Sequence, residues 1–158
     1  MTFAIAILAA GAITSEVPSP TKPWWKDPGP MKAAVKKALP EKSIVIDIKT
    51  QQLTAMEFGE PVFSLRCCTG KNNATPRGQF PIRQKLRYNR ALPKYGGAPI
   101  PFSLRLDIVK KGRRVPIAIH AYKSVPRVPS SHGCIRLTHT DAEKLFGWAE
   151  VGLQVLIR

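Results

Sequence analysis

The chain has 158 residues, which suggests one domain, and 44% of them are hydrophobic, enough for a core. Fifteen prolines and eleven glycines favour a β-rich fold with many turns over a helical bundle. The formal net charge of +15 predicts attraction to anionic surfaces such as nucleic acid, anionic lipid or an acidic wall polymer. The three cysteines form no C-x-x-C pattern, which argues against a zinc ribbon or a thioredoxin-like motif.

Residues 1–14 are expected to be a signal peptide or an N-terminal anchor. Their apolar run, MTFAIAILAAGAI, is too short to span a bilayer comfortably, and small residues at its end would suit a signal peptidase. No Lys or Arg lies near Met1, so an uncleaved anchor stays open. This segment predicts a secreted protein of the periplasm or cell envelope.

Residues 15–42 are expected to form a proline-rich arm followed by a short amphipathic helix within residues 30–40. This proline-rich segment carries Trp24 and Trp25, which would either pack on the domain or contact a membrane or a sugar.

From residue 43 onward, apolar residues recur at every second position, which predicts strands. Three short strands form a meander over residues 43–70, and adjacent Cys67 and Cys68 are expected beside a strand, because a bridge between neighbours would be strained. A loop covers residues 70–78 and a further strand residues 79–83. The long irregular stretch 86–101 resembles a lid or binding loop. Residues 102–120 predict a hairpin with a basic turn at 110–114, and the chain closes with a helix and a strand. Thr140 and Glu143 form a capping box that predicts the start of this helix.

The sequence SSHGCIRL, residues 130–137, has the residue types of an acyl-transfer site. Cys134 needs a base to form a thiolate, and His120 and His132 compete for that role. Gly133 allows a sharp turn that could aim main-chain N–H groups at an oxyanion. A metal site built from the two histidines and the cysteine matches no standard zinc spacing, so no metal and no cofactor are expected. His139 is expected on the surface.

Four separated segments resemble the YkuD-type L,D-transpeptidase catalytic domain family over residues 43–158. The segments are SIVIDIKTQQLTAMEFGEPVFSLRCCTGK, ATPRGQFPI, IAIHA and SSHGCIRLTHTDAEKL. The resemblance implies a mainly β fold, a β-sandwich or mixed sheet with one or two short helices and a long lid-like loop.

The family's chemistry implies roles for the residues of this chain. Such enzymes cross-link or modify bacterial peptidoglycan: a cysteine attacks the carbonyl before the terminal D-alanine of a stem tetrapeptide, and an amine resolves the thioester. Cys134 would be the nucleophile, His120 the base and then the acid, and the Ala121 carbonyl would orient the imidazole. His132 is preferred only as a supporting residue. Many relatives have Gly where this chain has Ala121.

The remaining carried-over roles concern the oxyanion and the substrate. Main-chain N–H groups of Gly133 and Cys134, with support from His132, would form the oxyanion hole, and Ser131 would hold the turn. Arg136 would organise the site or bind an anionic group of the stem peptide. Only ten residues lie between His120 and Ser131, a connection shorter than usual for the family, which bears on the donor pocket.

Three functions remain open at this point. The first is the transpeptidase, expected to act as a monomer on peptidoglycan stem peptides. The second is an L,D-carboxypeptidase or hydrolase on the same scaffold, in which water resolves the thioester. The third is a noncatalytic protein that binds an anionic cell-wall polymer or another polyanion. No recognised nucleic-acid motif occurs, so a specific nucleic-acid partner is not expected.

Overall fold

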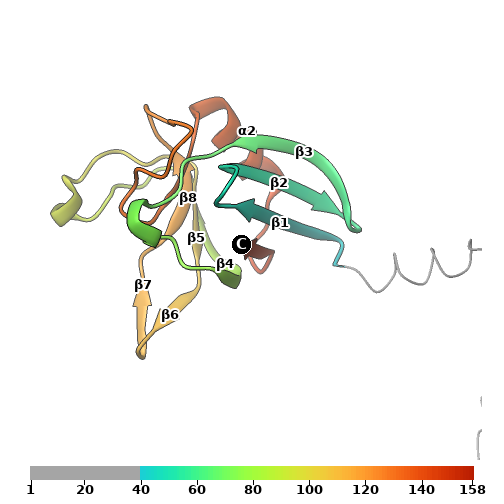
Figure 1. Ribbon diagram of the computed structural model, residues 1–158, viewed down its shortest axis with the longest axis horizontal. Helices are drawn as coiled ribbons and strands as arrows, with labels where there is room; N and C mark the ends of the chain where they lie inside the picture. Colours follow the sequence, from blue (N-terminus) through green and yellow to red (C-terminus); the bar gives the residue numbers. More distant parts are fainter. Residues whose placement is uncertain (1–39) are drawn as a thin grey trace, which may run out of the picture.

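The computed structural model describes residues 40–158 (Figure 1), so the expected signal segment, the tryptophan pair and the amphipathic helix lie outside the described residues. Ten strands and one α-helix within residues 40–158 confirm the predicted mainly β class. No helix in this part of the chain is long and apolar enough to cross a membrane. The elements are β1 (Lys42–Asp47), β2 (Gln52–Glu57), β3 (Glu60–Arg66), β4 (Gly78–Leu86), β5 (Ser103–Leu106), β6 (Ile108–Lys110), β7 (Arg113–Val115), β8 (Ala118–Ala121), β9 (Ile135–Leu137), α2 (His139–Trp148) and β10 (Gln154–Ile157).

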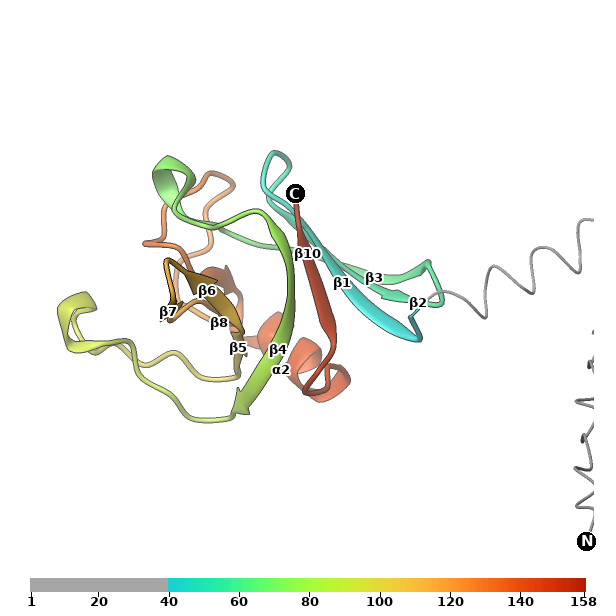
Figure 2. The same ribbon diagram turned by 90° about the horizontal axis from the view of Figure 1, so that it is seen from below.

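Eight strands form one mixed sheet in the order β3-β2-β1-β10-β4-β5-β8-β9. The pairs β1–β10 and β8–β9 are parallel, and the other neighbours are antiparallel. The predicted meander is therefore β1–β2–β3. Its alternating isoleucines point into the core, since Ile44 and Ile46 are fully buried. Figure 2 shows the sheet bending near β4, which turns β5 and β8 away from β1–β3.

The predicted hairpin over residues 102–120 is divided into two parts. Strands β5 and β8 belong to the main sheet, whereas β6 and β7 form a separate two-stranded ribbon that projects from it (Figure 1). The chain bends at Asp107, whose N–H bonds Pro81 O, and at Pro116, which has no N–H for a ladder. Lys111 and Gly112 both have positive φ, at 49° and 71°, the backbone of a tight two-residue turn.

Helix α2 begins two residues earlier than the sequence predicted. Its N-cap is Thr138, whose Oγ1 accepts a hydrogen bond from Asp141 N at 3.2 Å and donates to Asp141 Oδ2 at 2.7 Å. Thr138 and Thr140 each stand three residues before an acidic residue, so either could cap a helix. Because β9 ends at Leu137 and the helix begins at His139, Thr138 is the cap and the predicted cap at Thr140 was wrong.

The helix connects the two halves of the bent sheet through aromatic contacts. Trp148 meets Phe63 of β3 edge-to-face at 5.6 Å, and Phe146 meets Phe102, just before β5, at 5.7 Å. Leu145 of the same helix is fully buried. The helix therefore fixes the position of β5 and β8 relative to the meander.

The stretch 86–101, predicted to be irregular, forms an ordered loop whose outgoing and returning segments are joined by hydrogen bonds. Main-chain hydrogen bonds run across it from Phe102 N to Arg87 O, from Ile100 N to Asn89 O and from Ala91 N to Ala98 O. A short 3-10 turn, Pro93–Tyr95, forms its tip. We call residues 87–101 the arm.

Candidate active site

Parallel pairing of β8 and β9 brings His120 and Cys134 to one face of the sheet. The register sets His120 opposite Arg136, and Cys134 comes two residues before Arg136. Because alternate residues of a strand share a face, the imidazole and the thiol both project toward the same side. Both side chains line a cleft of about 200 Å³, with the arm on its other side.

One hydrogen bond fixes the imidazole of His120. Its Nδ1 lies 2.8 Å from the main-chain oxygen of Ala121, and only a protonated Nδ1 can donate to that carbonyl. The lone pair therefore lies on Nε2. The ring is 4% exposed, and burial lowers the pKa of His120 to about 4, against the hydrogen bond to Ala121 and with a contribution from the positive charge of Arg136. The imidazole is neutral at pH 7 and able to accept a proton.

Cys134 is a thiol in the resting protein. Burial raises its pKa, although the main-chain N–H of Ala118 and the charge of Arg136 both favour the thiolate. Its Sγ lies 3.8 Å from the carbonyl oxygen of Pro116. A neutral thiol and a neutral imidazole that line the same cleft can react by moving the proton to nitrogen as sulfur attacks, which is general-base catalysis.

The turn before Cys134 is fixed by Ser131 and Gly133. Ser131 is buried, and its Oγ donates to Cys134 O and accepts from Gly133 N at 3.0 Å. Gly133 has φ +131°, and a Cβ there would lie 3.1 Å from Ala74 O, so only glycine fits without strain. Ser131 holds the turn as expected.

The predicted oxyanion hole is altered by these bonds. The N–H of Gly133 is already used by Ser131 Oγ and is not free for an oxyanion. Within residues 40–158, the main-chain N–H groups of Cys134 and His132 have no hydrogen-bond partner, which leaves these two as available predicted donors.

Thr75 holds the cysteine turn, a role that the sequence alone did not assign. Its Oγ1 accepts from Gly70 N at 2.7 Å and donates to Gly133 O at 2.8 Å. The side chain is 2% exposed, and Gly70 packs directly on the turn, since a Cβ there would lie 2.8 Å from Gly133 Cα. The T-P-x-G segment marked this region, but a contact spanning 58 residues could not be read from it.

Cys67 and Cys68 directly follow β3, as the sequence predicted, and both are free and buried. Cys68 exchanges both main-chain hydrogen bonds with Arg136, each at 2.9 Å, and its Sγ lies 3.2 Å from Ser130 Oγ. Burial raises the pKa of Cys67 to about 12. This pair supports the back of the site and is not positioned in the cleft that Cys134 lines.

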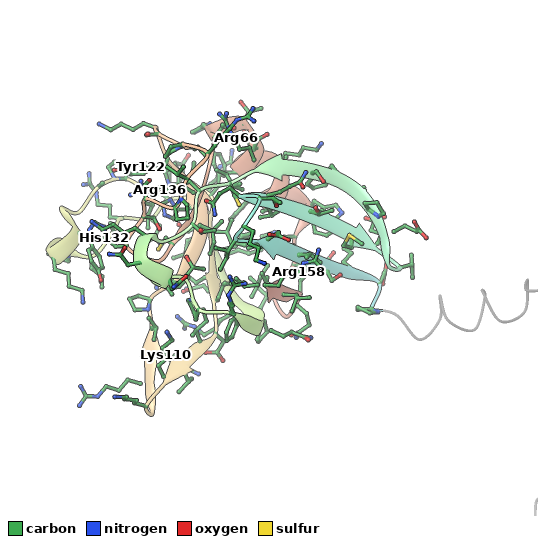
Figure 3. The ribbon with its side chains drawn as sticks, viewed as in Figure 1. Arg66, Lys110, Tyr122, His132, Arg136 and Arg158 are labelled. Atoms are coloured by element: carbon green, nitrogen blue, oxygen red, sulfur yellow. The ribbon has the colours of Figure 1, made fainter. Side chains whose placement is uncertain are left out.

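Arg136 presents a positive charge at the cleft. Its guanidinium stacks on the Tyr122 ring at 4.2 Å, and its Nη1 lies 3.5 Å from Ser130 Oγ. No ion pair among the described residues involves Arg136. Figure 3 shows Arg136 beside Tyr122, an aromatic residue of the site that the sequence did not single out.

His132 lies at the rim of the cleft and contacts the arm. Its ring stacks on Tyr95 with centroids 5.2 Å apart and an interplanar angle of 26°. It is exposed, whereas His120 is buried and held by its carbonyl partner.

His139 is exposed and packs edge-to-face on Phe102 at 5.0 Å. Among residues 40–158, no three His, Cys, Asp or Glu side chains are grouped to hold a metal ion.

Solved structures of several bacterial proteins share this fold. An L,D-transpeptidase from Mycobacterium smegmatis is 22% identical with a TM-score of 0.64, covering 75% of this chain and 58% of that one. An L,D-transpeptidase from Xylanimonas cellulosilytica is 22% identical with a TM-score of 0.63, covering 82% and 69%. L,D-transpeptidase 3 from Mycobacterium tuberculosis, solved in complex with a faropenem-derived adduct, is 18% identical with a TM-score of 0.62, covering 75% and 60%.

These likenesses concern the fold, because all the identities are low and the chain spans little more than half the length of several of these structures. A comparison with curated protein sequences gives no match. The family described as the L,D-transpeptidase catalytic domain, YkuD, matches residues 41–157, most of the chain. The chain therefore belongs to the YkuD family of L,D-transpeptidase catalytic domains.

Proposed function

We propose that this protein transfers an acyl group of a peptidoglycan stem peptide through a thioester on Cys134. In the first half-reaction His120 Nε2 takes the thiol proton while Sγ bonds to the carbonyl carbon before the terminal D-alanine. The C–N bond then breaks, and the imidazolium returns the proton to the departing amine of D-alanine. In the second half-reaction an acceptor amine attacks the thioester, loses its proton to His120, and releases the Cys134 thiol with a new amide bond.

The observation that carries this proposal is the orientation of the His120 imidazole. Its Nδ1–H is held by Ala121 O at 2.8 Å, which leaves Nε2 as the unprotonated nitrogen, and His120 and Cys134 line the same cleft. A purely structural histidine has no need of a thiol in the same cleft. A noncatalytic polyanion-binding protein, the third possibility from the sequence, would need neither group.

The surroundings of the pair support the same chemistry. The Cys134 N–H is an available main-chain donor for the oxyanion, and a donor of this kind typically contributes about 3 kcal/mol to a transition state. Arg136 offers a planar cation for a carboxylate of the stem peptide. The arm, anchored at its tip by the Tyr95–His132 stack, would cover the bound peptide and exclude water.

The test is incubation with purified disaccharide tetrapeptide, followed by analysis of the products. Free D-alanine together with a cross-linked dimer supports transpeptidation, whereas D-alanine with tripeptide alone assigns a carboxypeptidase, in which water resolves the thioester. Cys134→Ala should release no D-alanine. Cys67→Ala is the matched control, because it removes a buried thiol from the core and leaves the cleft intact.

We further propose that the enzyme works at the cell envelope as a monomer and docks on an anionic wall polymer. The apolar segment at residues 1–14 supports export, and the net charge of +15 supports docking on phosphate- or carboxylate-rich wall material. Fractionation of cells tests the location at the envelope, and light scattering of the purified protein tests the monomeric state.

A further inference from the structure

A second cleft, of about 470 Å³, lies beside the first and shares Tyr122 with it. It opens between the end of β8, the end of β3, the base of the arm and the start of α2. Its lining residues are Arg66, Pro99, Pro101, Ala121, Tyr122, Lys123, Val125, Thr138 and His139.

The charged and nitrogen-bearing side chains of this cleft suit the binding of an anionic group such as a carboxylate. Arg66 and Lys123 are exposed and form no ion pair within the described chain, and His139 adds a third nitrogen donor. No Asp or Glu lines the cleft. Apart from the hydroxyl-bearing Tyr122 and Thr138 the remaining wall is apolar, so an anion bound there would be partly shielded from water, which strengthens its attraction to the two cations.

The cleft adjoins Ala121, the residue that orients His120, which is the general base of the proposed reaction. Ala121 lines it, and the carbonyl of the same residue holds Nδ1 of His120. The main chain of Ala121 is itself fixed by its N–H bond to Pro101 O at 3.0 Å. Because Tyr122 lines both clefts, a molecule seated in the second cleft and extending past Tyr122 would enter the first cleft, which His120 and Cys134 line.

We propose that the second cleft binds a carboxylate of the amine-bearing acceptor peptide, through Arg66 and Lys123. This rests on the proposed transpeptidase function and adds the residues that select its acceptor. The cleft aligns the amine with the thioester, so acceptors with a carboxylate are favoured over water and over uncharged amines. Figure 3 shows Arg66 in the same part of the molecule as Tyr122 and Arg136, and Lys110 at the opposite end.

The experiment separates donor and acceptor steps. Cys134 is first acylated with tetrapeptide, and the thioester is then offered an acceptor peptide with a free carboxylate or the same peptide as its amide. Wild type should prefer the acid, and Arg66→Gln and Lys123→Gln should each lower kcat/KM for the acid about fivefold, with the amide unaffected. Acylation by the donor should be unchanged, Arg66→Lys should retain the preference, and Lys110→Gln should behave as wild type.

A binding measurement keeps the proposal testable if turnover fails. Titration of the acid and the amide into the Cys134→Ala protein should give tighter binding of the acid, lost in Arg66→Gln. Equal kcat/KM for acid and amide in wild type, or equal losses in Lys110→Gln, would overturn the acceptor site. Inhibition by inorganic phosphate without any preference for the acid would assign the cleft to a phosphate ligand and also overturn it. Absence of acylation would count against the proposed function, and the titration would still decide the cleft.

Discussion

The hydroxyl of Thr75 gives the sharpest test of how the cysteine turn is held. Thr75→Val keeps the shape of the side chain and removes the group that joins Gly70 N to Gly133 O. Both main-chain groups would be left without a partner in a buried site, at about 1–3 kcal/mol each, so the free energy of unfolding should fall by roughly 2–6 kcal/mol. Urea unfolding followed by circular dichroism measures it.

Two control variants make this result specific. Thr54→Val removes a hydroxyl that pairs with Ser64 Oγ at 3.1 Å on the exposed face of β2, and it should cost under about 1 kcal/mol. Thr75→Ser keeps the bridging hydroxyl and should retain most of the stability. The rate of Cys134 acylation should fall at least about tenfold in Thr75→Val, because a misplaced nucleophile loses its alignment. If Thr75→Val and Thr54→Val destabilise the protein equally, the bridge does not hold the turn.

Three further predictions concern the base, the arm and the charge. Because burial lowers the pKa of His120 to about 4, the acylation rate should fall only as the pH drops through about 4, and an acid limb near 6.5 would contradict this. The unfolded chain takes up this proton at the higher, ordinary pKa, so stability should also decline between about pH 6.5 and pH 4, and His120→Gln should remove that part of the decline. Tyr95→Ala should raise KM for the tetrapeptide about three- to tenfold by removing the stack on His132, whereas Tyr88→Ala, on an 82% exposed side chain, should leave KM unchanged. Binding to purified cell-wall sacculi should weaken steeply between low and physiological salt, and salt-independent binding would exclude docking by charge.

Local patterns predicted the strands and the region of the site. The alternation of Ile44 and Ile46 marks β1, and the S-H-G-C-I-R stretch contains the cysteine turn. These features depend on neighbours in sequence, so they can be read from sequence. The division of the predicted hairpin at Asp107 and Pro116 could not, because the bend is stabilised by a hydrogen bond to Pro81 on another strand.

Contacts between distant segments account for what the sequence did not predict. The hydroxyl of Thr75 reaches Gly133 and Tyr95 at the arm tip reaches His132, and both contacts depend on how the segments pack. A local hydrogen bond, from Gly133 N–H to Ser131 Oγ, removes this N–H from the expected oxyanion hole. The second cleft beside Tyr122 likewise appears only when β3, β8 and α2 are brought together.

The central claim is that Cys134 forms a thioester while D-alanine leaves. The most direct measurement is intact-protein mass spectrometry during reaction with tetrapeptide, combined with quantification of free D-alanine. Wild type and Cys67→Ala should release D-alanine and carry an adduct with the mass of the tripeptide acyl group, located by digestion on the peptide that contains Cys134. Release of D-alanine at the wild-type rate by Cys134→Ala, or an adduct on another residue, would contradict the account.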